Sequence, residues 1–373
     1  MNTVYMDYNA TTPPTDEILD LAQELQGRYW HNPNSIYKQG REARKLIDKA
    51  REQCAAAIGA DPEQIIFTSC ASESNAMAIS YGYYNKEGIF NSPFEHADIM
   101  ENHLSSNMIF TPYQPICHGK YDFVSTILVN NESGRMTPHH IPAYRKWNPS
   151  CLIHSDMSQA FGKTPIHVKD LDVDFATFSS QKIGSIRGCS VLYVKDPKAF
   201  KAHYEPLVYG HQENGMRGGT ENTVAIACMG LAMEKYNYDE AINDVWRHCK
   251  QMMTRAFNAI PGAVVLNTDT DTHKFTNNVV QVGFKGIESE SLVLMCDSQG
   301  LCISGGAACN SGSLEPSNEV KYLCGLHDPD TVNPHGVVRI SYGWGTTTHD
   351  IDQTIKIIKQ AVTNLREING GKR

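Results

Sequence analysis

Two side chains that could carry covalent chemistry follow apolar, strand-like runs in the middle of the chain. Asp156 comes shortly after the run Cys151 to His154, and Lys182 comes shortly after the run Asp174 to Phe178. In open α/β sheets ligands bind at the carboxyl ends of the strands, so both side chains are candidates for one site. A pyridoxal phosphate site requires a lysine amine for a Schiff base and a carboxylate against the pyridinium nitrogen. An ordinary surface Asp and a surface Lys would give the same pattern.

A turn rich in small and hydroxyl residues, 68–75, follows the short apolar run Ile65 to Thr68 and leads into an apolar helical run. Backbone N–H groups at the start of a helix bind phosphate, so this turn is a candidate phosphate cradle. A cap by Ser72 on an ordinary helix explains the same residues equally well. The local sequence leaves both interpretations open.

Cys309 lies within 304–313, a stretch of glycine and small residues. Such a stretch packs poorly, and we expect a mobile loop here. A thiolate on a mobile loop can take a group inside a pocket and carry it outward to an acceptor, which a cysteine fixed in the core cannot do.

The elements that would position these residues alternate along most of the chain. Residues 38–58 have helical apolar spacing and end at Gly59, a good C-terminal cap. Further short apolar runs predict strands, and amphipathic patterns predict helices over 239–260 and near 350–368. The pattern favours a mostly parallel sheet covered on both faces, followed by a separate C-terminal domain. The predicted strands are 65–68, 123–129, 151–154, 174–178 and 190–194.

Composition narrows the class of protein. The 373 residues are 41% hydrophobic, which is enough to bury a large core. The sequence shows no run of eighteen apolar residues and no signal peptide. We therefore expect a cytoplasmic enzyme with no membrane contact. The net charge of −8 argues against direct nucleic-acid binding. The 11 cysteines are scattered, which predicts mostly buried thiols, no disulfide framework and no metal site.

Ordered motifs over nearly the whole chain resemble the NifS/IscS cysteine desulfurases of the class V aminotransferase family, in the group with a long catalytic loop. The single motifs are short, but their number and order make chance agreement improbable. They include Tyr5-Met6-Asp7, Ala10-Thr11-Thr12-Pro13, Asn32-Pro33, Glu95-His96, Asn130-Asn131-Glu132, His154 with Asp156 and Gln159, Arg217 to Asn222 (RGGTEN), Ala308-Cys309, Ser313-Leu314-Glu315-Pro316-Ser317, and Arg339 with Ser341.

The resemblance implies a pyridoxal 5'-phosphate cofactor with Lys182 as the Schiff-base lysine and Asp156 as the partner of the ring nitrogen. It implies that Gln159 donates to the ring hydroxyl and that His96 stacks on the ring, where a near-neutral imidazole can exchange protons. A solvent-facing loop histidine is the alternative for His96. The implied phosphate contacts are Ala71, Ser72, Ser179 and Gln181, with Thr220 reaching the site of the other subunit of a homodimer.

The resemblance also assigns the substrate. Arg339, helped by Asn131, would clamp the carboxylate of L-cysteine, because a guanidinium suits bidentate recognition; a structural ion pair is the alternative for Arg339. Cys309 would attack the substrate sulfur, leaving L-alanine and a persulfide for a protein sulfur acceptor in iron–sulfur assembly, tRNA thiolation or DNA phosphorothioation.

The implied fold is the aspartate aminotransferase-like fold of pyridoxal-phosphate-dependent transferases. Its large α/β domain, residues 15–240, has a mostly parallel seven-stranded sheet. Its smaller α+β domain combines 1–14 with 241–373 and carries the catalytic loop at about 303–318.

The chain departs from the family pattern at several places, including the segment Ile183 to Gly188 after the lysine. Gln181 stands where a histidine usually precedes the lysine; it can donate a neutral hydrogen bond to phosphate but cannot become charged. Cys70 replaces a glycine of the phosphate turn, and Tyr37 stands where a histidine is frequent. The alternatives to a cysteine desulfurase are a selenocysteine lyase or other enzyme on the same fold, and a catalytically weakened scaffold.

Overall fold

The structure, a computed structural model, describes residues 3–86, 88–101, 121–270, 274–305, 315–327 and 332–370. The chain forms two compact units. Unit 1 comprises Met1–Thr11, Asn130–Met136 and Asp239–Arg373, and unit 2 comprises Thr12–Val129 and Thr137–Tyr238. Residues 130–136 thus group with the C-terminal part of the chain, whereas the sequence analysis assigned them to the large domain, residues 15–240. The predicted domain boundaries, 15–240 against 1–14 with 241–373, stay a prediction.

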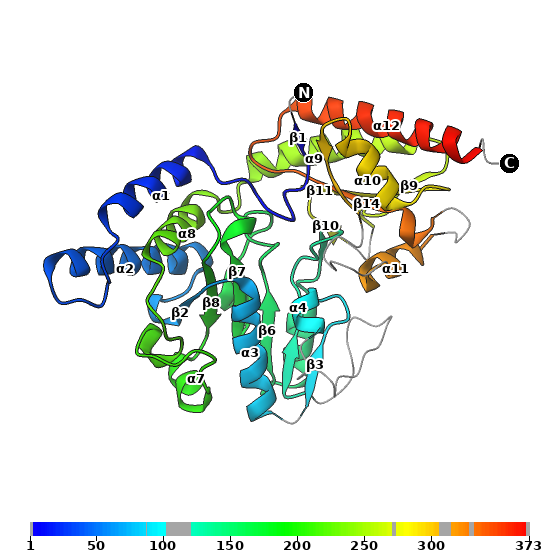
Figure 1. Ribbon diagram of the computed structural model, residues 1–373. Helices are drawn as coiled ribbons and strands as arrows, with labels where there is room; N and C mark the ends of the chain where they lie inside the picture. Colours follow the sequence, from blue (N-terminus) through cyan, green and yellow to red (C-terminus); the bar gives the residue numbers. More distant parts are fainter. Residues whose placement is uncertain are drawn as a thin grey trace. The chain divides into compact units, whose positions relative to one another are not determined.

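Unit 2 is built on a six-stranded sheet in the order β2-β8-β7-β6-β4-β3 (Figure 1). β3, β4, β6 and β7 run parallel, and β8 is antiparallel to both of its neighbours. The mostly parallel sheet is confirmed; the seventh expected strand is not found in the described residues, and 102–120 lie outside them. The strands are β2 (Ile65–Thr68), β3 (Ile89–Asn91), β4 (Phe123–Ser125), β6 (Leu152–Asp156), β7 (Phe175–Ser179) and β8 (Ser190–Val194).

The burial of the central strands explains their near-continuous apolar runs. All five residues of β7 and all five of β8 are buried. Because successive side chains of a strand point to opposite faces, both faces of the sheet are covered, as the sequence predicted. The prediction that a strand extends over 123–129 is wrong, since β4 ends at Ser125. Beyond it, the backbone N–H groups of Thr126 and Leu128 donate to the carbonyls of His154 and Asp156 in β6.

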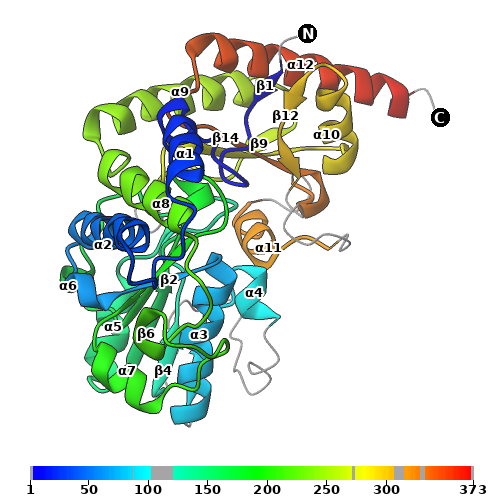
Figure 2. The same cartoon turned by 60° about the vertical axis from the view of Figure 1, so that its left-hand side comes forward.

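Helices α1, α2 and α8 pack together at one end of unit 2 (Figure 2). In α2 the buried residues Ala43, Ile47, Ala50, Cys54 and Ile58 recur at helical spacing. α3 packs along β2, β6, β7 and β8. The helices of unit 2 are α1 (Asp16–Arg28), α2 (Lys38–Ile58), α3 (Ala71–Asn85), α4 (Ala97–Met100), α5 (His140–Trp147), α6 (Val168–Leu171), α7 (Pro197–His203) and α8 (Thr223–Lys235), with the short 3-10 helices η1 (Pro62–Gln64), η3 (Ser180–Lys182) and η4 (Glu213–Gly215).

Unit 1 is built on an antiparallel four-stranded sheet in the order β13-β14-β11-β9. β1 pairs in parallel with β12, and β5 pairs with β10. The strands are β1 (Val4–Tyr5), β5 (Arg135–Met136), β9 (Ala263–Val265), β10 (Lys274–Phe275), β11 (Val279–Phe284), β12 (Leu301–Cys302), β13 (Ser304–Gly305) and β14 (Val337–Ser341).

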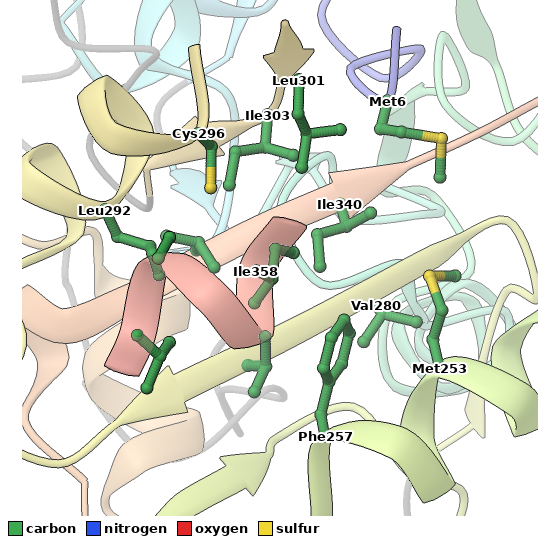
Figure 3. Packing of buried hydrophobic residues seen from close by; sticks show 14 of the residues in the cluster. Met6, Met253, Phe257, Val280, Leu292, Cys296, Leu301, Ile303, Ile340 and Ile358 are labelled. Atoms are coloured by element: carbon green, nitrogen blue, oxygen red, sulfur yellow. The ribbon is translucent and has the colours of Figure 1, made fainter. Parts of the chain in front are cut away.

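The core of unit 1 lies between this sheet and three helices. Side chains from β11, β14, α9, α10 and α12 interleave there, including Val280, Ile340, Phe257, Leu292 and Ile358 (Figure 3). The predicted helices at 239–260 and 350–368 are confirmed. The helices are α9 (Glu240–Asn258), α10 (Ser289–Asp297), α11 (Asn318–Cys324) and α12 (Thr348–Gly370), with the 3-10 helix η5 (Pro334–Gly336).

Nine cysteines fall in the described part of the chain, all as free thiols, and seven of these are buried, as the sequence predicted. Burial raises the pKa of several of them, including those of Cys54 and Cys151 to about 12. Such thiols stay protonated and unreactive near neutral pH. No helix in the described ranges combines the length and the apolar character that crossing a membrane requires.

The end of α2 gives a test of the local fold. Gly59 has φ +71, and a Cβ there would lie 2.2 Å from the imidazole of His167. We expect Gly59→Ala to lower the stability of the protein by about 1–2 kcal/mol, because a side chain is strained in this conformation. Thermal unfolding measures the loss. The control is Gly27→Ala in α1, where a Cβ meets nothing within 4 Å. This variant should be neutral or stabilising. Equal melting temperatures of the two variants would contradict the strained C-cap conformation assigned to Gly59.

Candidate functional site

Strand register brings several predicted residues of unit 2 to one edge of the sheet. Thr68, the last residue of β2, and Ser179, the last residue of β7, both pair with Ser190. Asp156, the last residue of β6, pairs with Thr177 in β7. The polar residues therefore gather where the parallel strands end, as the sequence predicted.

Lys182 follows directly from this edge, at the end of η3. The backbone around it is held by Thr12, whose N–H donates to the carbonyl of Gln181 at 2.9 Å and whose hydroxyl donates to the carbonyl of Lys182 at 3.0 Å. The Ser180 hydroxyl closes the turn by donating to the carbonyl of Ile186. The half-buried side chains of Gln181 and Lys182 thus extend from a fixed backbone.

Asp156 belongs to a chain of polar contacts that ends at His96. The Asn75 amide donates to Asp156 Oδ2 at 3.1 Å and contacts both carboxylate oxygens of Asp98 at 3.4 Å. Asp98 in turn lies 3.0 Å from His96 Nδ1. The backbone N–H of Ser158 donates to Asp156 Oδ1 at 2.8 Å. The candidate partner of the ring nitrogen and the candidate stacking imidazole are therefore connected through Asn75, a residue that the sequence did not single out.

Asp98 is held in its charged form within this network. Burial alone would raise the pKa of its carboxyl, but hydrogen bonding and charge from His96, with further hydrogen bonds from Ser72 and Asn75, outweigh burial and lower it. His96 is the N-cap of α4, and its side chain is 38% exposed. Its contact with Asp98 fixes the imidazole on one side, and its role as a stacking residue stays a prediction.

Glu95 is a buried carboxyl beside the same network. Burial raises the pKa of Glu95 well above its usual range, and the nearby charge of Asp156 raises it further. Its Oε1 accepts the backbone N–H of Ile127, and its Oε2 has no hydrogen-bond partner among the described residues. The protonated form is thus favoured, which keeps a second charge away from Asp156. The motif Glu95-His96 was visible in the sequence, but the burial that defines this role was not.

The start of α3 has the features of an anion site. The backbone N–H groups of Ala71 and Ser72 have no acceptor in the described part of the chain. The N-cap is Cys70, not Ser72, and it makes no side-chain capping bond, so the alternative of a Ser72 cap is wrong. N–H groups at the start of a helix of this length suit a phosphate.

Glu73 ties this turn to the RGGTEN segment. It accepts from the backbone and hydroxyl of Ser69 and forms a bidentate pair with Arg217 at 2.8 and 3.1 Å. Thr220, three residues after Arg217, is exposed.

Gln159 and Lys163 form a buried pair beyond β6, with only 3% and 6% of their surfaces exposed. Lys163 Nζ donates to Gln159 Oε1. Because an ammonium group can only donate, this contact fixes the amide so that its N–H₂ group points away from Lys163. Gln159 is thereby oriented as a donor, the role expected of it.

These residues of unit 2 fit the phosphate, ring nitrogen and ring hydroxyl of pyridoxal phosphate. An anion-binding helix start, a hydrogen-bonded buried carboxylate and an oriented amide donor surround one sheet edge, with a lysine on the adjoining turn. The individual roles of these residues stay predictions.

The candidate substrate residues lie in unit 1. Arg339 is 3% exposed; its Nη2 donates to Asp7 Oδ1 at 2.7 Å and its Nη1 donates to the carbonyl of Asn131 at 3.0 Å. The ion pair considered as the alternative for Arg339 is therefore present. A fixed guanidinium is also what carboxylate recognition needs, so the clamp stays a prediction.

The predicted loop at about 303–318 is only partly described. Ser304–Gly305 form strand β13, paired with β14, so this part of the range is not loop, and at the other end Ser317 is the N-cap of α11, which begins at Asn318. The pairing of β13 with β14 joins residues far apart in the sequence, which the small residues did not reveal. Cys309 lies outside the described residues.

Glu95 gives a prediction for pH dependence. The pKa of Glu95 is higher in the folded protein than in the unfolded chain. The free energy of unfolding therefore falls as the pH rises from the unfolded-state pKa to the folded-state pKa. Each unit of difference between the two pKa values corresponds to about 1.4 kcal/mol. Glu95→Gln keeps the acceptor for Ile127 but removes the titration. We expect the variant to gain thermal stability relative to wild type between pH 5 and pH 8, as measured by scanning calorimetry.

The matched control is Glu63→Gln, at an exposed carboxyl of the same unit. Its pH profile should follow that of wild type. Parallel profiles for wild type and Glu95→Gln would show that Glu95 is ionised in the folded protein.

Comparison with known proteins places this site in a family. The family model described as aminotransferase class-V matches residues 4–102 and 99–354. A cysteine desulfurase of Trichormus azollae is 32% identical, with 99% of this chain and 95% of the relative covered, and a cysteine desulfurase IscS of Rickettsia massiliae is 33% identical, with 98% and 92% covered.

Solved structures give the same result. A NifS-like protein superposes with a TM-score of 0.83 at 25% identity, covering 97% of this chain and 99% of that one. SspA in complex with cysteine superposes with a TM-score of 0.72 at 25% identity, covering 90% and 98%. From the full-length sequence match and the shared fold, this chain belongs to the class-V aminotransferase family.

Proposed function

We propose that this protein is a cysteine desulfurase that converts L-cysteine to L-alanine and passes the sulfur to an acceptor. The observation that carries the proposal is the near-complete match to curated cysteine desulfurases at 32–33% identity. The cofactor is pyridoxal phosphate, on which the class-V aminotransferases depend. The solved relative that holds cysteine supports the choice of substrate. The grouping of Asp156, Gln159 and Lys182 at one sheet edge supports the choice of cofactor.

Each residue of unit 2 contributes a distinct function in this proposal. Pyridoxal phosphate, when bound, takes up the electron pair released at the substrate. Asp156, which accepts hydrogen bonds from Asn75 and from the backbone N–H of Ser158, holds a proton on the ring nitrogen. Lys182 would hold the cofactor through its amine, and the same amine, when free, would move the Cα proton of the substrate. His96 exchanges protons with the reacting groups.

Sulfur transfer is the task of Cys309. Its thiolate attacks the sulfur of bound cysteine, a new S–S bond forms, and the bond between Cβ and sulfur breaks. The electron pair of that bond remains with the carbon fragment, which takes up protons and leaves as alanine. Cys309 retains the sulfur as a persulfide until a protein acceptor removes it.

A homodimer is part of the proposal. Thr220 is exposed, and large apolar side chains of the same unit are exposed as well: Trp30 by 69%, Ile36 by 90% and Tyr209 by 72%. Glu221, which follows Thr220, connects this segment to residues 34–44, since it accepts from Asn34 at 2.8 Å and from Arg44 at 2.7 Å. Exposed apolar surface of this kind supports a subunit contact. We place the protein in the cytoplasm, where its free cysteines stay reduced.

The direct test is product formation by wild type, Lys182→Ala and Cys309→Ser. We expect wild type to absorb light as a cofactor-bound protein and to form alanine and sulfide from cysteine with added thiol. Lys182→Ala should lose the Schiff-base absorption and activity, and Cys309→Ser should keep the absorption but lose at least about a thousandfold in rate.

Cys302→Ser is the matched control, because Cys302 is a partly exposed thiol near Cys309 in sequence with no proposed role. It should retain activity. Full activity of Cys309→Ser on cysteine would exclude persulfide chemistry at this residue, and a colourless wild type would favour a scaffold.

Substrate recognition makes a separate prediction. Arg339→Lys keeps the positive charge but loses the bidentate geometry. We expect KM for cysteine to rise roughly tenfold, which corresponds to about 1.4 kcal/mol. Cofactor absorption should not change, because the proposed cofactor residues all lie in unit 2. Unchanged KM would leave Arg339 as a structural partner of Asp7 only.

A further inference from the structure

A buried ion pair in unit 1 joins the segment that carries Asn131 to helix α11. Arg135 and Glu319 are 4% and 2% exposed. Their contact is bidentate, with Arg135 Nη2 2.6 Å from Glu319 Oε2 and Arg135 Nε 2.9 Å from Glu319 Oε1. The guanidinium also lies over the ring of Tyr322, 5.2 Å from its centroid. Charges this deeply buried are costly unless they are well paired.

Two serines strengthen the connection. The Ser133 hydroxyl donates to Glu319 Oε1 at 2.5 Å, and the Ser317 hydroxyl donates to Glu132 Oε2 at 2.6 Å. Ser317 is also the N-cap of α11, accepting from the backbone N–H of Val320. We call this set of contacts, made by Glu132, Ser133, Arg135, Ser317 and Glu319, the α11 tether.

The tether holds a turn with little freedom of its own. Asn130 Oδ1 accepts the backbone N–H groups of Glu132 and Ser133 at 2.9 and 3.1 Å. Gly134 has φ +74, and a Cβ there would lie 2.4 Å from the hydroxyl of Thr276. The next residues pair with β10. The position of the whole turn is therefore set by its contacts on both sides.

The turn sets the position of Asn131, whose carbonyl accepts from Arg339 Nη1 at 3.0 Å and from the Asn9 amide at 3.1 Å. Arg339 is in addition paired in register with Ser304 of β13. The tether and the proposed carboxylate clamp thus share one continuous set of contacts within unit 1.

We propose that Arg135 and Glu319 are positioning residues that hold Asn131 and Arg339 in the geometry required to bind the substrate carboxylate. The inference rests on the proposed function and deepens it. A tether of this kind acts through geometry, and a displacement of about 1 Å in a binding residue can cost as much as a hundredfold in catalysis. A merely structural ion pair would instead affect only how much of the protein is folded.

The test separates these two roles by binding affinity. L-alanine, the proposed product, carries the same amino-acid carboxylate and can be titrated into the cofactor-bound enzyme by its effect on cofactor absorption. We expect Glu319→Gln to raise Kd for alanine and KM for cysteine about tenfold or more, with the starting absorption unchanged. Arg135→Lys, which keeps the charge, should restore part of the affinity lost in Arg135→Met.

Asp174→Asn is the matched control, because Asp174 forms a partly buried pair with Arg145 in unit 2, 2.7 Å between Nη2 and Oδ2. It should lower thermal stability without changing either constant. If Glu319→Gln does not fold, the double variant Arg135→Met with Glu319→Leu replaces the pair by apolar packing and carries the same test.

Wild-type Kd and KM in a folded Glu319→Gln or double variant would overturn the inference, as would failure of wild type to bind alanine at all. A wild type that binds alanine but forms none from cysteine would refute the proposed function alone, and the comparison of Kd values would still decide the inference.

Discussion

A negatively charged carboxylate at the end of a buried strand is the constraint on which unit 2 depends. Asp156 is 5% exposed, and a carboxylate so deeply buried is tolerated only with donors close by. The donors are the Asn75 amide from α3 and the backbone N–H of Ser158. α3 must therefore lie against β6 at this point. The same helix presents its first N–H groups at the same sheet edge, so one packing arrangement positions both the residue proposed for the ring nitrogen and those proposed for the phosphate.

The neighbouring carboxyls show how that charge is protected. Asp98 shares Asn75 with Asp156, but it lies against His96 and is compensated by it. Glu95 is buried, and burial together with the charge of Asp156 raises its pKa well above its usual range, which favours the protonated form. Three acidic side chains can thus lie in one region, because only those with hydrogen-bonding or charged partners carry a negative charge. Burying Glu95 next to Asp156 costs folding free energy, and a core that served stability alone would not include this arrangement.

The sequence predicted most of the elements of unit 2 because their signals are local. The helical spacing in 38–58, the cap at Gly59 and the short apolar runs at 65–68 and 190–194 all agree with the structure. Asp156 and Lys182 were found because strand ends are recognisable. Asn75 was not, since an amide inside a helical run has no distinguishing pattern until its tertiary neighbours are known. The sequence could not exclude Ser72 as a cap, because the hydroxyl-rich turn hides where the first helical residue lies.

The proposed substrate contacts in unit 1 could be predicted only through family resemblance, for a physical reason. Asp7, Asn131 and Arg339 come from the beginning, the middle and the end of the chain, and their contacts join residues 122 to 332 positions apart. No periodicity or local motif encodes such contacts. The grouping of Met1–Thr11 and Asn130–Met136 with the C-terminal part follows from the same fact. The ion pair of Asp7 with Arg339 draws the N-terminal segment onto β14, and the pair of Arg135 with Glu319 draws the middle segment onto α11. Substitutions in these two short segments should therefore act on the proposed substrate contacts in unit 1, although most of the residues that flank them in sequence belong to unit 2.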